Sequence, residues 1–180
     1  PGAARKGEDT MQEHGLKISE LVTLFNLEVL NRGSDYDTAL LTITDVNRPG
    51  LQFHSFYDYF DPRRLQVLGK AEITYLKGLT TEQRRKCFDD LFLYDIPALV
   101  ISRGLDCFPE CLESARVHER TLLRTEETTV EFTSHTIEYL NRVLAPCVTR
   151  HGVLLDISGE GVMITGDSGI GKSESAIELI

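Results

Sequence analysis

Short apolar runs alternate along the chain with longer segments in which apolar residues return every three or four positions. Runs at 65–68, 98–102 and 121–124 predict strands, and the run at 98–102 has the mainly apolar composition of a strand that is buried on both faces. Two further strand candidates lie at 27–30 and 40–44.

The longer segments predict four helices, at 70–79, 80–93, 109–117 and 128–144. Thr80 followed by Gln83 is a helix-start signal, and Pro109 suits the first position of a helix. A shorter helix, beginning near residue 18, is expected to be capped by Ser19. The segment 128–144 is amphipathic, with apolar residues Val130, Phe132, Ile137, Leu140, Val143 and Leu144.

This alternation of strand and helix predicts an α/β domain with a largely parallel sheet. Residues 1–17 are polar and charged and predict a disordered lead-in. Ala145-Pro146 ends the long helix, so we expect an N-terminal domain at 18–145 and the start of a second domain at 146–180. In the second domain, two runs at 148–157 and 161–165 flank Ser158-Gly159-Glu160-Gly161, which predicts a β-hairpin.

A glycine-rich segment after this hairpin has the spacing G-x-x-x-x-G-K-[ST], the phosphate-binding loop of P-loop nucleotide enzymes. Its glycines can take backbone angles closed to other residues, so the N–H groups can turn toward phosphates. Lys172 would bring a positive charge to the β- and γ-phosphates, and the Ser173 hydroxyl would reach Mg²⁺. The nucleotide-binding residues predicted by the motif are Gly166, Asp167, Ser168, Gly169, Ile170, Gly171, Lys172 and Ser173.

The flanking residues decide between a nucleotide site and an accidental Gly/Ser turn. The run 161–165 is apolar and short, as a buried strand would be, and 173–180 has a helical pattern with Ala176, Ile177 and Ile180 on one face. A strand before the loop and a helix after it favour the nucleotide site. A P-loop enzyme also needs carboxylates for Mg²⁺ or for a proton, and none follows Ile180. We therefore expect the chain to be a truncated piece of a longer protein.

Charge and cysteine usage exclude some classes of function. The 180 residues carry a formal charge of −9, which argues against a general nucleic-acid or anionic-membrane surface. No apolar run approaches the ~18 residues of a membrane span. Cys107 and Cys111 are spaced four apart, but no second Cys or His pair completes a metal site, so free thiols and no metal cluster are expected.

Two groups of residues keep alternative interpretations. The aromatic residues within 53–60 form either a packed cluster or a binding surface. An isolated histidine is more often structural than catalytic, and we expect His135, on the long helix, to be structural or exposed. His151 stands at the entry to the hairpin, which could bring its imidazole beside the phosphates as a donor or proton carrier.

Several segments go beyond generic P-loop features. They are T-D-V-N-R-P-G-L-Q at 44–52, Y-D-Y-F at 57–60, L-Q-V-L-G-K at 65–70, I-S-R-G-L at 101–105, L-R-T at 123–125, H-G-V-L-L-D at 151–156 and the stretch 164–176. With these segments the chain, from about residue 18 onward, resembles the HPr kinase/phosphorylase family. These bacterial enzymes phosphorylate a serine of the phosphocarrier protein HPr and also remove that phosphate.

The resemblance implies a cytoplasmic homohexamer that uses ATP (or pyrophosphate) and Mg²⁺ and regulates bacterial carbon metabolism. Its N-terminal α/β domain has no assigned catalytic role, and its kinase domain is related to phosphoenolpyruvate carboxykinase. By position, Lys172 matches a catalytic lysine, Ser173 a Mg²⁺ ligand and His151 the active-site histidine. The family's catalytic aspartate, second metal carboxylate and arginine lie beyond Ile180, so the chain is expected to be inactive alone.

A different class of function competes with this one, namely a stand-alone regulatory or ligand-binding α/β module that keeps only a remnant of the loop. A generic small-molecule P-loop kinase fits less well, because such kinases often place the loop near the N-terminus. The presence of the family's aspartate pair within about 20 residues after the loop would favour the HPr kinase.

Overall fold

A computed structural model gives the architecture and describes residues 15–146 and 151–179. The chain divides into two compact units, one ending at Ala145 and the other beginning at Pro146. The predicted lead-in falls mostly on residues 1–14, outside the described residues, but Leu16 and Lys17 at its end form strand β1 (Leu16–Lys17).

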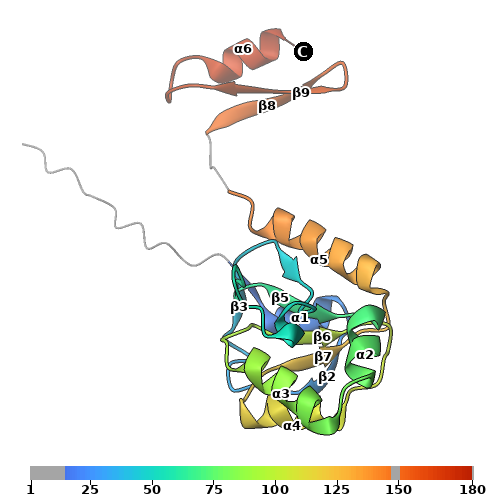
Figure 1. The fold of residues 1–180 in the computed structure, drawn as a ribbon. Coiled ribbons are helices and arrows are strands. Elements are labelled where there is room, and N and C mark those ends of the chain that lie inside the picture. The colour runs from blue at the N-terminus through green and yellow to red at the C-terminus, as the bar shows by residue number, and fades with distance from the viewer. Residues whose placement is uncertain (1–14, 147–150, 180) are drawn as a thin grey trace, which may run out of the picture. The chain divides into compact units, whose positions relative to one another are not determined.

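The first unit is built on a five-stranded sheet (Figure 1). Its strands, in spatial order, are β2 (Glu28–Asn31), β7 (Leu122–Arg124), β6 (Leu99–Ile101), β5 (Leu65–Leu68) and β4 (Val46–Asn47). All neighbours pair in parallel except β2, which is antiparallel to β7. The prediction of an α/β fold with a largely parallel sheet is therefore confirmed. Strand β1 pairs separately with β3 (Leu40–Leu41), a shorter strand than the predicted 40–44.

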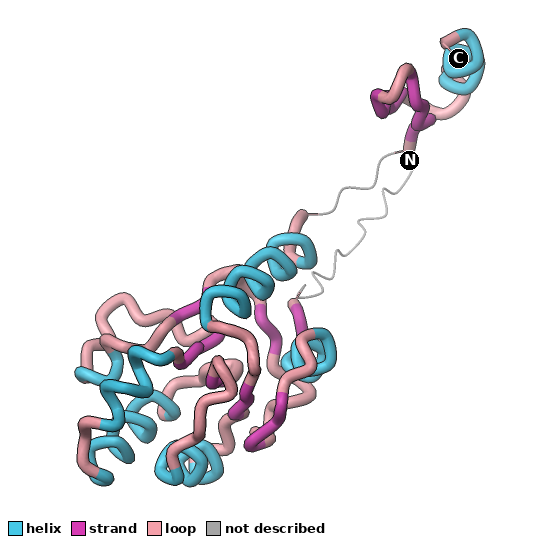
Figure 2. Tube along the Cα trace, turned by 90° about the vertical axis from the view of Figure 1, so that its right-hand side faces the viewer, coloured by secondary structure: helices cyan, strands magenta, loops and turns pink. Residues whose placement is uncertain are grey.

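Helices cover both faces of this sheet (Figure 2). The core on one face includes residues of α1 (Ile18–Leu24) and α5 (Thr129–Val143). The core on the other face includes residues of α2 (Lys70–Lys77), α3 (Thr81–Phe92), α4 (Pro109–Val117) and the short 3-10 helix η1 (Gln52–His54). The first unit is thus a three-layer α/β/α sandwich.

The central strand β6 is apolar throughout because both of its faces are buried. On β6, Val100 joins the core under α1 and α5, whereas Leu99 and Ile101 join the core under α2, α3 and α4. Successive side chains of a strand point to opposite faces, so each position of β6 is filled by an apolar residue. This accounts for the run at 98–102 that the sequence predicted to be a buried strand. On the neighbouring strand β5, Gln66 is a fully buried polar exception.

Local hydrogen bonds explain where two of the helices begin. Thr80 Oγ1 accepts from the Gln83 N–H at 3.3 Å, and Gln83 Oε1 accepts from the Thr80 N–H at 3.0 Å, which completes a capping box at α3. Thr128 and Glu131 form the same arrangement at α5. The predicted Ser19 cap is wrong, since α1 begins after Lys17 and the Ile18 N–H donates to the Ala39 carbonyl at 3.1 Å.

The buried stripe of α5 differs from the predicted apolar face. Phe132, Thr136 and Leu140 are buried at intervals of four residues, whereas Val130 is 71% exposed. Val143 is also on the exposed side. The apolar pattern alone did not distinguish these positions. Which residues of α5 are buried depends on how the helix packs against the core of the first unit, and this packing buries Thr136 between Phe132 and Leu140.

The aromatic residues within 53–60 were predicted to form either a packed cluster or a binding surface, and the structure shows some of them packed and others exposed. Phe53 is buried, and Tyr57 and Phe60 pack with Tyr94, the ring centroids of Tyr57 and Tyr94 being 4.8 Å apart. Tyr59 instead lies 99% exposed, with a left-handed backbone. Most of the segment therefore has a structural role, while its outer residues remain free to contact solvent.

The second unit consists of a β-hairpin and a short helix. Strand β8 (Gly152–Ile157) pairs antiparallel with β9 (Glu160–Thr165), and α6 (Lys172–Glu178) follows. The Gly159 N–H donates to Asp156 Oδ1 at 2.8 Å in the turn, where Ser158 and Gly159 have positive φ. The predicted hairpin is confirmed, although the part of its first strand predicted at 148–150 lies outside the described residues.

Burial in the second unit differs from the prediction. Leu155 and Ala176 are buried, but Val162 and Met163 on β9 are exposed, so β9 is not a buried strand within this unit. Ile177 is 76% exposed and does not share the burial of Ala176. Ile180, the third residue of that predicted face, lies outside the described residues. Ala176 is thus the buried residue of α6 within this unit.

Candidate functional site

The predicted phosphate-binding loop joins the end of β9 to the start of α6, as the motif requires. Gly169 and Gly171 adopt φ angles of +85° and +90°, a region that residues with a side chain rarely occupy. These two glycines therefore set the path of the loop. Asp167, Ser168 and Ile170 lie exposed along it.

Gly166 has a different role, because its φ is not in the left-handed region. A Cβ built at this position would lie 2.7 Å from Ile170 Cδ1, so the absence of a side chain lets Ile170 fold back over the start of the loop. The sequence suggested special backbone angles at all three glycines, whereas the structure assigns them to two.

Lys172 lies across the loop that precedes it. Its Nζ donates to the Gly166 carbonyl at 2.8 Å and to the Asp167 carbonyl at 2.5 Å. The ammonium group is therefore already held beside the backbone that the motif assigns to phosphate contact. A phosphate entering the loop would meet this charge, with the lysine exchanging carbonyl oxygens for phosphate oxygens.

Ser173 occupies the second position of α6 and is exposed. A hydroxyl at this place in the first turn of the helix has the chemistry of a hard oxygen ligand, which suits Mg²⁺. The loop and Ser173 together fit a nucleotide phosphate and its metal ion. Mg²⁺, when bound, neutralises negative charge on the phosphates.

The hairpin register connects His151 with the loop. Gly152, the residue after His151, pairs with Thr165, the residue before Gly166. The entry to β8 and the beginning of the loop thus lie at the same end of the hairpin. His151 is exposed there, which leaves its imidazole accessible to a phosphate or an incoming substrate.

We expect Gly169→Ala to weaken the binding of ATP with Mg²⁺ by the whole protein about tenfold. The reason is that a residue with a Cβ needs roughly 1–2 kcal/mol to adopt the left-handed backbone conformation that Gly169 has. No atom lies within 4 Å of a Cβ built at Gly169, so the effect is confined to the backbone. Gly161→Ala is the matched control, since its Cβ is equally free and its φ is not positive. Calorimetric titration measures both, and equal losses in the two variants would contradict this account of the loop.

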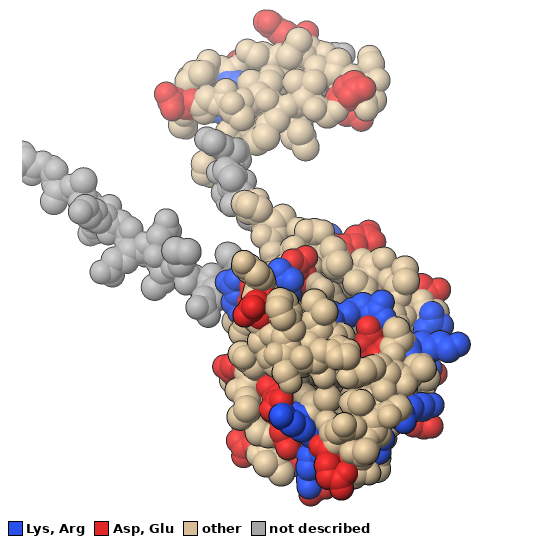
Figure 3. Space-filling view, in the orientation of Figure 1, with Lys and Arg blue, Asp and Glu red and all other residues tan. Residues whose placement is uncertain are grey.

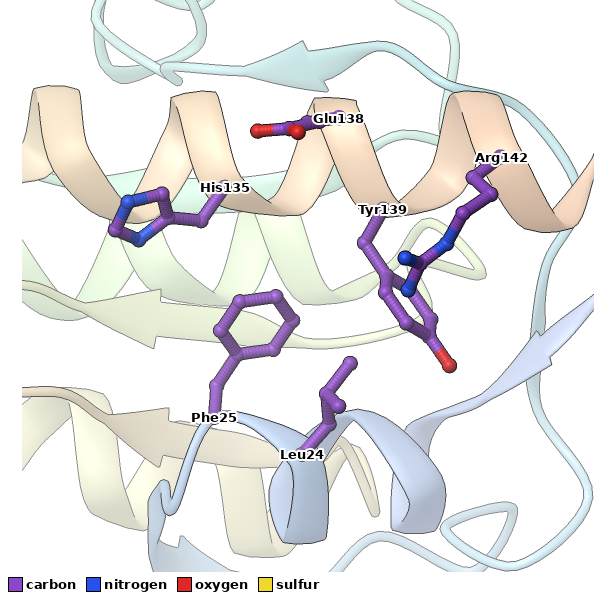
Figure 4. Close-up of a pocket in the computed structure, with 6 residues that line it drawn as sticks. All are labelled: Leu24, Phe25, His135, Glu138, Tyr139 and Arg142. Atoms are coloured by element: carbon purple, nitrogen blue, oxygen red, sulfur yellow. The ribbon is translucent and has the colours of Figure 1, made fainter. Parts of the chain in front are cut away.

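A separate groove lies in the first unit, between α1 and α5 (Figure 4). Leu24 and Phe25 point toward His135 and Tyr139 of α5, and the Arg142 guanidinium lies 5.0 Å from the centre of the Tyr139 ring. His135 is exposed and its Nδ1 lies 3.0 Å from Glu127 Oε2, which agrees with the surface role expected for it.

The charged side chains and the potential metal ligands of the described residues bear on the classes of function that the sequence argued against. On the face shown in Figure 3, the Lys and Arg side chains of the first unit alternate with Asp and Glu and form no continuous basic area. Within 15–146 and 151–179, no three His, Cys, Asp or Glu side chains gather as a metal site. Cys87, Cys107 and Cys111 are free thiols, whereas Cys147 lies outside the described residues. No helix in the described part is long and apolar enough to cross a membrane.

Comparison with known families identifies both parts of the chain. Residues 16–140 match the family model described as HPr Serine kinase N terminus, and residues 142–180 match the HPr Serine kinase C-terminal domain. The chain belongs to the HPr serine kinase family. The resemblance suggested by the segments at 44–52 and 151–156 is thereby confirmed.

Curated members of the family are substantially similar. The HPr kinase/phosphorylase of Alkaliphilus metalliredigens is 46% identical over 165 residues, which are 92% of this chain and 53% of that protein. The enzyme of the same name from Clostridium perfringens strain SM101 is 44% identical over 166 residues, with 92% and 53% covered. This chain therefore spans about half the length of the curated relatives that it matches.

Among solved structures, the CBS and DRTGG domains of the regulatory region of Clostridium perfringens pyrophosphatase match with a TM-score of 0.49 and 14% identity. The match covers 73% of this chain and 50% of that one. That structure was determined with the activator diadenosine tetraphosphate.

Proposed function

We propose that the chain is part of a kinase that transfers a phosphoryl group from ATP to a serine of the phosphocarrier protein HPr, and that also catalyses the reverse reaction. The observation that carries the proposal is the β9–loop–α6 segment, with two left-handed glycines and Lys172 lying across the loop, in a member of the HPr serine kinase family. Through this reaction the protein would regulate bacterial carbon metabolism.

Each predicted site residue has a defined part in this proposal. The backbone of Gly166 to Gly171 holds the phosphates, and Lys172 stabilises the charge that develops on the transferred group. Ser173 supplies an oxygen ligand to Mg²⁺. His151 hydrogen-bonds to phosphate or carries a proton at the serine, since it stands at the hairpin end from which the loop begins.

The domain assignment follows from the same elements. We propose that residues 18–145 form the N-terminal domain without a direct part in the chemistry, and that 146–180 begin the kinase domain. The resemblance further supports a cytoplasmic homohexamer. The formal charge of −9 and the mixed charges on the face of the first unit in Figure 3 argue against nucleic acid or an anionic membrane as a partner.

The test is a kinase assay with the whole protein. Purified protein, Mg²⁺, ATP and HPr are incubated together, and mass spectrometry follows the gain of one phosphate on HPr. HPr variants with single serines changed to alanine locate the acceptor, and adding inorganic phosphate to phosphorylated HPr tests the reverse reaction. Binding of ATP without any transfer to HPr would contradict the kinase and favour the regulatory module as the alternative.

A further inference from the structure

A second concave surface of the first unit lies where the parallel strands β4 and β5 end. It is an open groove of about 420 Å³ whose lining includes Arg48, Leu51, His54, Ala71, Glu72 and Tyr75. Arg48 follows β4 directly, and Ala71 and Glu72 belong to the helix that follows β5. The groove thus lies at the carboxyl ends of two neighbouring parallel strands.

An arginine is fixed at the wall of this groove by a buried carboxylate. Arg48 Nη2 donates to Glu72 Oε2 at 2.8 Å, and the Gly69 N–H donates to the same oxygen at 2.9 Å. Glu72 is only 8% exposed, whereas the Arg48 side chain is 49% exposed. A guanidinium has five N–H donors, so the contact with Glu72 leaves donors directed away from the carboxylate.

The pair is held in its charged state. Burial by itself would raise the pKa of Glu72, but the hydrogen bonds from Arg48 and from the backbone outweigh it and lower the pKa below the usual range. Glu72 therefore remains ionised at neutral pH and anchors the guanidinium. Because the two charges cancel, an anion bound here would depend on directed hydrogen bonds from Arg48 and on additional apolar contact.

Gly69 is required for this arrangement. A Cβ built at Gly69 would lie 3.2 Å from Arg48 Nη2, 3.3 Å from Glu72 Oε2 and 2.6 Å from Thr129 Oγ1. Thr129 Oγ1 in turn lies 2.7 Å from Ser102 Oγ, and Ser102 is fully buried. The arginine thus rests on a packed polar layer and not on a flexible surface loop.

Aromatic and apolar groups stand beside the arginine. The rings of His54 and Tyr75 are 4.6 Å apart at their centroids, and the Tyr75 hydroxyl lies 3.4 Å from His54 Nδ1. Leu51, on the same groove, is a largely exposed apolar side chain. A flat ring placed against these groups would bury apolar area that is now in contact with water.

We infer that this groove binds a small organic anion that joins a flat ring to a phosphate or a carboxylate. The anionic group accepts hydrogen bonds from Arg48, and the ring packs against His54, Tyr75 and Leu51. The site is separate from the phosphate-binding loop, belongs to the other unit and does not depend on the proposed kinase activity. It would give the N-terminal domain a ligand to sense.

Phenyl phosphate and benzoate test the inference, with phenol as the uncharged ring. The protein has five histidines and six tyrosines, so the ring resonances of His54 and Tyr75 can be assigned by NMR with His54→Ala and Tyr75→Phe. We expect phenyl phosphate or benzoate to shift these resonances saturably with a Kd on the order of millimolar, and phenol to bind about tenfold more weakly. Comparison of the two anions identifies the preferred head group.

Arg48→Met removes the guanidinium and keeps an apolar stem, and should weaken anion binding about tenfold. Arg63→Met is the matched control, because Arg63 is exposed, pairs with Asp61 and does not line the groove. His54→Ala leaves the Arg48–Glu72 pair intact and should also weaken binding, which preserves the test if Arg48→Met does not fold. Equal binding of phenol, unchanged binding in Arg48→Met and His54→Ala, or anions that leave the His54 and Tyr75 resonances of the unmodified protein unshifted would overturn the inference.

Discussion

Replacing Lys172 by alanine is expected to reduce phosphoryl transfer to HPr by the whole protein on the order of 10³-fold, in line with the loss of one preorganised charged group. Lys172 is the side-chain cation of the loop motif, and its Nζ is already held at the Gly166 and Asp167 carbonyls. Its removal leaves backbone N–H groups as the donors that the loop itself offers to the phosphates. Transfer rates at saturating ATP and HPr measure the effect.

Lys77→Ala is the control for this variant. Lys77 lies exposed in the last turn of α2, in the other unit, so its loss should leave transfer unchanged. Circular dichroism of both variants verifies that the fold is intact. A Lys172→Ala protein that still phosphorylates HPr at the original rate would refute the assignment of the loop as the catalytic phosphate site.

Phe88→Ala is expected to lower the free energy of unfolding of the first unit by about 3–5 kcal/mol, the usual cost of removing a fully buried phenylalanine. Phe88 is fully buried, and its ring contacts Phe53 at 5.8 Å and both Phe92 and Phe108 at 6.4 Å between centroids. Truncation would leave a cavity among three aromatic rings on three different elements, which cannot all move to fill it.

Urea unfolding followed by tyrosine fluorescence measures this loss for the first unit alone, because all six tyrosines lie at or before Tyr139 and the chain has no tryptophan. Phe56→Ala is the matched control, since Phe56 is exposed and the same atoms are removed from a solvated position. The control should change stability by less than about 0.5 kcal/mol. A similar loss in both variants would mean that the core around Phe88 does not dominate stability.

The features that the sequence predicted well depend on interactions within a few residues. The start of α3 is fixed by Thr80 and Gln83, and that of α4 by Pro109. Strands 65–68 and 121–124 were recognisable because the two cores take up their leucine and valine side chains, although Gln66 and Thr121 are buried polar residues within these runs. The largely parallel sheet then followed from the alternation of these elements.

The features that it predicted poorly depend on distant parts of the chain. The burial of Thr136 on α5 and the exposure of Val130 follow from contacts with elements far away in sequence. The start of α1 at Ile18 depends on the Ala39 carbonyl and on β1 pairing with β3. None of these partners can be recognised from the local pattern.

The same division applies to the sites. The sequence could mark the three loop glycines because conformational freedom belongs to glycine itself, but only the structure separates Gly169 and Gly171, with their positive φ, from Gly166. The approach of His151 to the loop followed from a hairpin that the turn residues indicated. Arg48 and Glu72 are 24 residues apart, and no residue adjacent to either of them in sequence indicates that the two form an ion pair. Their groove could be found only once the fold was known.

The edge strand β2 has a consequence for how the protein comes to be folded. Glu28 pairs with Arg124 across 96 residues, so β2, the strand of this sheet that is synthesised first, joins the sheet through β7, the strand of this sheet that is synthesised last. The parallel strands β4, β5, β6 and β7 can assemble in the order of their synthesis, each onto its predecessor. Strand β2 can pair with the sheet only after residue 124, at the end of β7, has been synthesised. Contacts between residues so far apart in sequence slow folding. Until then Val29 and Leu30 remain available to chaperones or to other nascent chains.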